Sequence, residues 1–358
     1  LMLIIPLKVI QISLACGMSP HSPTAFAQYG NYLATIEDDF VEGYRYAKLA
    51  LSLMKKIPAR AHEGSIMFYS NHTRLYVEPM QSSIECYLDV YKAAMKSGNP
   101  YAVASSFAYS SLCLWSGKDL NAVIVSMNNT MKESKSYKNF VVLSLVLPIF
   151  RVALRLKGES DASAPQQDNL TDVLGETFNG DESDGKYALH LQFVMFANFA
   201  EALIFRELSV ARDAVEKYYS LEQCESASPT MCFRRFYSGL VSFWVARVMN
   251  GKNGSKKWID RAIECKAEFV KLSVSASAWN FENKSFLLQA EEHFYSRNFA
   301  HAETLYDAAI FSSKTHKFLN EEALAYELAG HFYLETGRKD KSVPYFMQAF
   351  EKYTEWGA

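Results

Sequence analysis

Apolar and polar residues along most of this chain recur with the period of an α-helix. After Pro79, for example, Ile84, Leu88 and Tyr91 fall on one face of a single predicted helix. Turn signals rich in Pro, Gly and Ser separate such segments. We therefore predict an all-α fold of roughly sixteen helices with almost no strand. The clearest helices are expected at 1–16, 24–36, 40–56, 63–77, 101–115, 139–156, 187–206, 210–222, 230–250 and 256–272.

Two segments near the C-terminus follow the same template, one 40 positions after the other. Small residues in each alternate with aromatic ones, so that the ridge of a second helix fits against an aromatic and a small residue of the first. This pattern is typical of a tetratricopeptide repeat, whose helix pair must stack on neighbours to bury its apolar face. The matched positions are Phe286, Ala290, His293, Ala302, Tyr306 and Ala309 with Tyr326, Gly330, Tyr333, Ser342, Phe346 and Ala349.

The repeats predict a tetratricopeptide-like superhelix, an α-solenoid of stacked antiparallel helix pairs. We expect one continuous array, with divergent N-terminal helical repeats over 1–157 and C-terminal repeats over 187–358. Between them, 158–186 is expected to be an irregular loop, because its eight acidic residues and few apolar ones do little to offset the entropy of ordering. In the C-terminal seam, we expect the following residues to be buried or packed across helix crossings: Ala302, Ala309, Gly330, Ala349, Tyr306, Tyr333 and Phe346.

Composition narrows the choice of partners. The chain has 358 residues, of which 49% are hydrophobic, and its 21 Tyr and 24 Phe suit the seams between helices. The formal net charge is −2, so no basic surplus is present to neutralise phosphates, and nucleic acid is not expected as a partner. The aromatic seams are therefore interpreted as core and not as a base-stacking surface.

The N-terminal run Leu1–Leu7 is interpreted as part of a broken-off amphipathic helix of a longer chain. A signal peptide is the alternative, but the segment lacks the basic n-region of a signal peptide, and Lys8 interrupts its apolar residues. It is also too short to span a bilayer, so no membrane insertion is expected. Six scattered cysteines without a CxxC pair suit buried free thiols in a reducing compartment, which predicts a cytoplasmic location.

Three short patterns resemble chemical motifs but lack what the chemistry requires. Gly117-Lys118 has no glycine five residues earlier, and Asp119 stands where a phosphate-binding loop has Ser or Thr. His62-Glu63 resembles the start of a phosphoacceptor histidine box. Its position at a helix N-terminus instead favours a capping role, in which the negative charge of Glu63 suits the helix dipole. Glu291-Glu292-His293 and His301 lack HExxH spacing. The sequence therefore predicts no catalytic residue, no cofactor and no metal site.

Three blocks of the sequence stand out together. The first consists of Ile12-Ser13-Leu14 with Ser19-Pro20, Ala25–Gly30, Gly43–Tyr46 and Ala50-Leu51. The second is Tyr101-Ala102 with Gly117–Leu120, and the third is Asn320–Ala329 with the closing Trp356-Gly357-Ala358. In this order they resemble one family of very large signalling proteins. In that family a helical repeat region joins a serine/threonine kinase and a STAND-type predicted ATPase to a GAF domain and a histidine kinase or cyclase. This chain is similar to the repeat region alone, so the resemblance implies a regulatory segment and carries over no catalytic residue.

These observations lead to a non-catalytic interaction or scaffold module that binds a protein, a peptide or a neighbouring domain of the same polypeptide. On the concave face of the last repeat, Glu327, His331 and Glu335 are the candidate binding residues, because they lie one turn apart beside the seam. One alternative is an autoinhibitory sensor lid on an adjacent ATPase or kinase domain. A weaker alternative is a helical enzyme with an unrecognised buried site.

Overall fold

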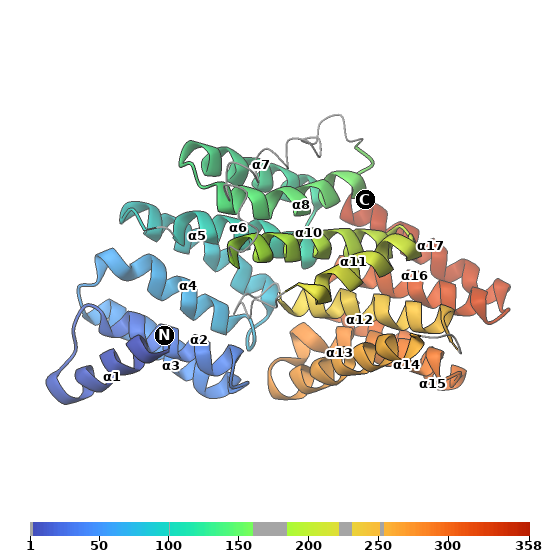
Figure 1. The fold of residues 1–358 in the computed structure, drawn as a ribbon, viewed down its shortest axis with the longest axis horizontal. Helices are drawn as coiled ribbons and strands as arrows, with labels where there is room; N and C mark the ends of the chain where they lie inside the picture. The colour runs from blue at the N-terminus through green and yellow to red at the C-terminus, as the bar shows by residue number, and fades with distance from the viewer. Residues whose placement is uncertain (1–2, 100, 160–184, 222–230, 251–253) are drawn as a thin grey trace. The chain divides into compact units, whose positions relative to one another are not determined.

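The computed structural model describes residues 3–99, 101–159, 185–221, 231–250 and 254–358 (Figure 1). These residues form sixteen α-helices and one 3-10 helix, and no strand occurs among them, which confirms the all-α prediction. The helices are α1 (Ile4–Cys16), α2 (Ser22–Thr35), α3 (Phe40–Lys56), η1 (Arg60–His62), α4 (Glu63–Arg74), α5 (Met80–Lys96), α6 (Tyr101–Trp115), α7 (Leu120–Ser136), α8 (Phe140–Leu156), α10 (Gly185–Ile204), α11 (Leu208–Ser220), α12 (Met231–Val248), α13 (Ser255–Ser275), α14 (Ala278–Tyr295), α15 (Phe299–Thr315), α16 (Leu319–Glu335) and α17 (Lys339–Trp356).

The helix boundaries follow local signals in the sequence. Asp39, Asp119 and Asn139 cap α3, α7 and α8, and each side chain accepts a hydrogen bond from a backbone N–H in the first turn. Helix α8 continues through Pro148. Most of the expected acidic loop, 160–184, lies outside the described residues, and α10 begins at Gly185, two residues before the predicted start.

The chain divides into two compact units. Among the described residues, unit 1 comprises 3–112 with Met231 and 274–280, and unit 2 comprises 113–221, 232–273 and 281–358. Each unit therefore contains segments that are distant in sequence. The three-part division expected from the sequence, and its superhelical stacking, stay predictions.

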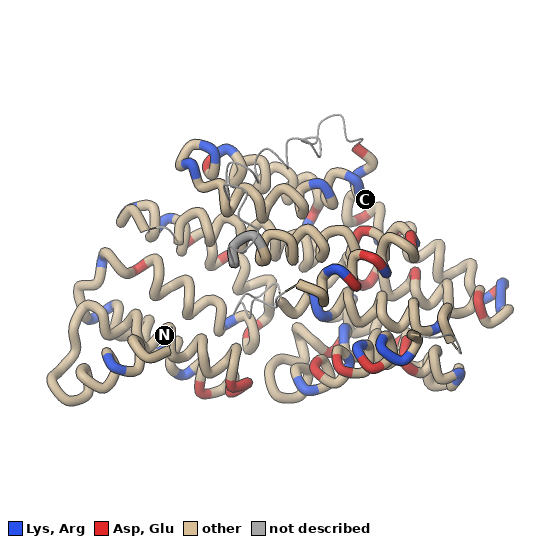
Figure 2. Tube along the Cα trace, in the orientation of Figure 1, with Lys and Arg blue, Asp and Glu red and all other residues tan. Residues whose placement is uncertain are grey.

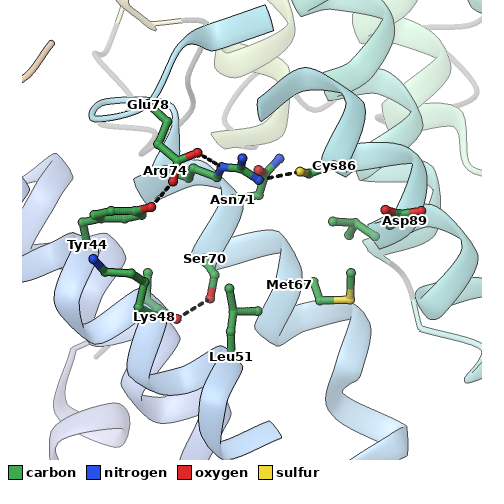
Figure 3. Close-up of a pocket in the computed structure, with 12 residues that line it drawn as sticks. Tyr44, Lys48, Leu51, Met67, Ser70, Asn71, Arg74, Glu78, Cys86 and Asp89 are labelled. Carbon is green, nitrogen blue, oxygen red and sulfur yellow. Dashed lines mark hydrogen bonds and ion pairs between the residues drawn. The ribbon is translucent and has the colours of Figure 1, made fainter. Parts of the chain in front are cut away.

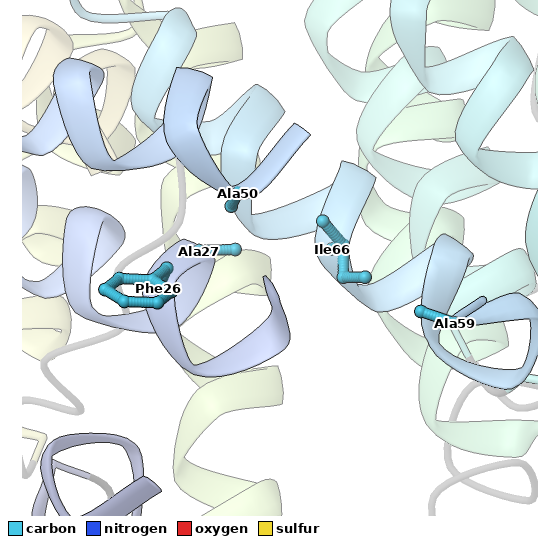
Figure 4. Packing of buried hydrophobic residues seen from close by; sticks show 5 residues of the cluster. All are labelled: Phe26, Ala27, Ala50, Ala59 and Ile66. Atoms are coloured by element: carbon cyan, nitrogen blue, oxygen red, sulfur yellow. The ribbon is translucent and has the colours of Figure 1, made fainter. Parts of the chain in front are cut away.

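Unit 1 is built on close helix crossings at small residues. Helix α2 packs on α3, both pack on α4, and α4 packs on α5. At the crossing of α2 and α3, a Cβ on Gly30 would lie 2.6 Å from the carbonyl oxygen of Gly43, and a Cβ on Gly43 would lie 2.6 Å from that of Gly30. Only glycine allows this approach. A buried cluster lies at these helices (Figure 4), made up of Phe26, Ala27, Ala50, Ala59 and Ile66.

Asn280 closes the turn between α4 and α5 from 200 residues further along the chain. Its amide donates to the carbonyls of Leu75 (2.9 Å) and Glu78 (2.7 Å), and its carbonyl accepts from the backbone N–H of Met80 at 2.8 Å. Each contact satisfies a backbone group at a helix end. A strictly linear solenoid contacts only neighbouring repeats, so this unit is held together by more than sequential stacking.

Asn320 repeats this arrangement within unit 2, 40 positions after Asn280. Its amide donates to the Trp115 carbonyl at 3.0 Å, at the end of α6. A Cβ on Gly117 would lie 2.7 Å from the Asn320 side-chain oxygen, and Gly117 has a positive φ of 79°. The tight turn against Asn320 therefore accounts for a glycine at position 117, and no phosphate-binding role is needed to explain it. Trp356 closes the same turn by donating to the Lys118 carbonyl at 2.8 Å.

The seam predicted for the last two repeats is confirmed. Ala302, Ala309, Gly330 and Ala349 are buried, as are Tyr306 and Tyr333. Phe346 differs, because it is only half-buried at the edge of the seam. Its ring nevertheless fills the space above Gly330, where a Cβ would meet ring carbons at 2.8 Å. The 40-residue register is therefore the packing register of α14 to α17.

Candidate functional site

The three candidate residues on α16 do lie together, and all three have partners within unit 2. Glu327 accepts a hydrogen bond from the Tyr353 hydroxyl at 2.7 Å, and His331 Nε2 lies 3.7 Å from the Glu327 carboxylate. Glu335 lies 3.7 Å from Arg206 and 3.7 Å from Arg247, and it is the most exposed of the three.

Arg247 is the centre of this charged cluster. It forms an ion pair with Glu291, which also accepts from the Tyr306 hydroxyl at 2.5 Å. The Arg247 guanidinium lies 4.0 Å above the Phe294 ring. Burial, together with the charge of Glu291, raises the pKa of Tyr306, so this hydroxyl stays a neutral donor. Glu335 thus faces two arginines of the same unit, and the role of Glu327, His331 and Glu335 in binding a partner stays a prediction.

The other patterns singled out in the sequence do not converge on one site. Glu63 lies in the first turn of α4, directly after His62 in η1. Glu292 pairs with Lys266 at 3.0 Å, whereas the rings of His293 and His301 stack on each other at 5.3 Å. Within the described ranges, no group of three or more His, Cys, Asp and Glu side chains could hold a metal ion.

A pocket of about 210 Å³ lies in unit 1 between α3, α4 and α5 (Figure 3). Each helix presents one face to it, so the lining combines three segments that are separated in sequence. Its apolar lining consists of Ala47, Leu51, Met67 and Val90. Its polar lining consists of Tyr44, Lys48, Ser70, Asn71, Arg74, Glu78, Cys86 and Asp89.

One edge of the pocket is a fixed polar network. The Arg74 Nε lies 2.5 Å from the Glu78 carboxylate, which also accepts from the Tyr44 hydroxyl. The other end of the guanidinium donates to the Cys86 sulfur at 2.7 Å (Figure 3). Burial raises the pKa of Glu78. Arg74 and Glu78 therefore hold α4 and the turn after it in place.

The remaining rim carries one exposed cation and one exposed carboxylate. Lys48 Nζ lies 4.3 Å from the centre of the Tyr44 ring and makes no ion pair with any residue that the structure describes. Asp89 lies 3.5 Å from Lys92, and both side chains are largely solvated. The Lys48 ammonium is thus exposed next to the apolar lining of the pocket. Sequence reasoning did not single out Lys48 or Asp89, because each resembles an ordinary solvated helix position.

The sequence matches no protein-family model, and neither the curated proteins nor the solved structures searched give a match. No helix in the described part of the chain has the length and apolarity needed to cross a bilayer. Basic and acidic residues are interspersed along the helices (Figure 2).

Proposed function

We propose that this chain is a non-catalytic interaction module whose unit 1 pocket receives a bulky apolar side chain of a protein or peptide. The observation that carries this proposal is the pocket itself, in which Leu51 and Met67 adjoin the exposed cation of Lys48. Drug-sized ligands usually occupy about 300–1,000 Å³. A cavity of about 210 Å³ suits a single large side chain better than a whole small molecule.

The charges of the rim define which segment fits best. A carboxylate next to the apolar residue would meet Lys48, whereas Asp89 lies on the opposite helix and repels an acidic segment there. The ligand is therefore an apolar residue with Asp or Glu on one side. Arg74, Glu78 and Cys86 are engaged with one another, which supports binding over catalysis at this pocket.

The sequence resemblance extends the proposal to the setting of the module. In a polypeptide that joins kinase and ATPase domains, the module would be a cytoplasmic regulatory segment, and its ligand would be a neighbouring domain or a partner protein. Reading the flanking sequence tests this part separately from the pocket.

Selection from a displayed library of random dodecapeptides tests the pocket in the full chain. We expect enrichment of a bulky apolar residue beside Asp or Glu, with binding then measured by fluorescence anisotropy of the synthetic peptide. Lys48→Glu should weaken binding several-fold, and Met67→Glu at least about tenfold, which corresponds to about 1.4 kcal/mol. Lys55→Glu is the matched control, because Lys55 is exposed on the same helix and does not line the pocket.

A charge exchange excludes non-specific effects. Replacing the peptide's acidic residue by Lys should restore binding to the Lys48→Glu chain and weaken it on the natural chain. Equal binding of the selected peptides to the natural, Lys48→Glu and Met67→Glu chains would refute the proposal.

A further inference from the structure

The last helix, α17, exposes an apolar stripe. Val343 is 55% exposed, Met347 66% and Phe350 75%. Residues spaced by four and then three positions lie on one face of a helix. Surface helices normally direct such a face to the core and charged residues to solvent. Three large exposed side chains in a row therefore mark a surface for another element.

Acidic residues border this stripe on one side. At 100° per residue, Asp340, Glu351 and Glu355 fall on the same flank of the stripe, and all three are exposed. Glu355 pairs with Lys352 at 2.8 Å, but the Lys352 side chain is only 19% exposed and points away from the stripe by its helical position. Lys339 lies on the other flank. The surface is thus apolar with one acidic border.

In the preceding repeat, the matching face of α15 shows which side chains pack against this face of a repeat's second helix. Positions 40 before Val343 and Met347 are Glu303 and Asp307 of α15. Glu303 pairs with Arg338 at 2.8 Å and Lys341 at 3.0 Å, and Asp307 accepts from the Tyr345 hydroxyl at 2.7 Å. An acidic face of α15 thus receives basic and aromatic side chains from the start of α17, the second helix of the next repeat.

We infer that the stripe formed by Val343, Met347 and Phe350 docks an amphipathic helix of a partner protein whose apolar face has a basic border. The stripe continues the surface by which α15 receives α17, and the charge of Asp340, Glu351 and Glu355 selects a basic helix. This site lies in unit 2 and involves no residue of the unit 1 pocket, so either site can fail without the other.

Two synthetic helical peptides test this site on the full chain. Both have leucines along one face, one with lysines and the other with glutamates beside the leucines. The lysine-bordered peptide should bind more tightly. Met347→Asp with Phe350→Asp should weaken its binding at least about tenfold. Val274→Asp should leave it unchanged, because Val274 is 85% exposed on α13 and is not part of the stripe.

Charge reversal decides whether binding is specific. Glu351→Lys with Glu355→Lys should reverse the preference toward the glutamate-bordered peptide. Equal binding of both peptides, or binding that survives Met347→Asp with Phe350→Asp, would overturn the inference. Sedimentation of the chain alone supplies the other test. A concentration-dependent dimer that this double substitution abolishes would assign the stripe to a second copy of the chain and would also overturn it.

Discussion

Lys284 on α14 and Glu321 on α16 form an ion pair of 2.8 Å with side chains that are 0% and 1% exposed. The ammonium also lies 4.0 Å from the centre of the Phe318 ring, and the Asn283 amide donates to the same carboxylate. Burial raises the pKa of Glu321, and Lys284 opposes that shift. The first helices of the last two repeats, α14 and α16, are thus joined by charges that depend on each other.

Replacing one member of this pair should lower the free energy of unfolding far more than replacing both. Glu321→Leu leaves the Lys284 charge buried without its partner, which should cost about 3–5 kcal/mol of unfolding free energy. Adding Lys284→Met should recover most of that loss. Urea unfolding of the two single variants and the double variant measures the coupling. Lys257→Met, at the exposed pair with Glu216, serves as control and should cost less than about 1 kcal/mol. Equal costs for Glu321→Leu and Lys257→Met would contradict this account.

Gly330→Leu should overpack the crossing of α16 and α17. The new side chain would meet the Phe346 ring, so we expect a loss of about 1–3 kcal/mol. Compared with the natural chain, hydrogen exchange of this variant should show a larger loss of protection across 285–350 than in the N-terminal helices. Ala300→Leu makes the same kind of change at an exposed position of α15 and should alter stability by less than about 0.5 kcal/mol. Unchanged protection in Gly330→Leu would show that the repeat register is wrong.

His72 should make unit 1 sensitive to acid. Burial lowers its pKa to about 3, against an ordinary value of about 6.5. The unfolded chain therefore binds the proton more tightly, and stability falls as the pH drops from about 6.5 toward about 3. Between pH 7 and pH 5 this group should account for about 2 kcal/mol. Urea unfolding of His72→Leu should show a correspondingly smaller loss over that interval. An identical pH dependence in both proteins would mean that folding leaves the pKa of His72 unchanged.

Asn280→Leu should destabilise the turn between α4 and α5. The substitution removes three hydrogen bonds and leaves the Met80 N–H without its acceptor, so we expect a cost of about 1–3 kcal/mol or more. Asn121→Leu, at an exposed position of α7, should change stability by less than about 0.5 kcal/mol. Thermal unfolding of the two variants gives the comparison, and a similar melting temperature for both would argue against this role of Asn280.

The sequence was sufficient for the seam of α14 to α17, because two copies of one template in the same chain reveal which positions need small residues. It was insufficient for Asn280 and Asn320, whose backbone partners lie about 200 residues earlier in the chain. A polar residue at the start of a helix looks the same whether it faces water or closes a distant turn. Only folding brings those segments together.

The candidate sites show the same limit. Helical spacing placed Glu327, His331 and Glu335 on one face. It could not reveal that Arg206, in the turn after α10, and Arg247, on α12, approach that face. The unit 1 pocket was missed because α3, α4 and α5 each contribute a few residues that are unremarkable within their own helix. A pocket assembled from separate helices has no signature along the chain.

A crystal structure of the full chain with its tightest selected peptide would show directly whether the unit 1 pocket is the binding site. We expect an apolar peptide side chain within about 4.5 Å of Leu51 and Met67, with the neighbouring carboxylate at hydrogen-bond distance from Lys48 Nζ. A peptide bound elsewhere on the chain, with the pocket between α3, α4 and α5 unfilled, would contradict it.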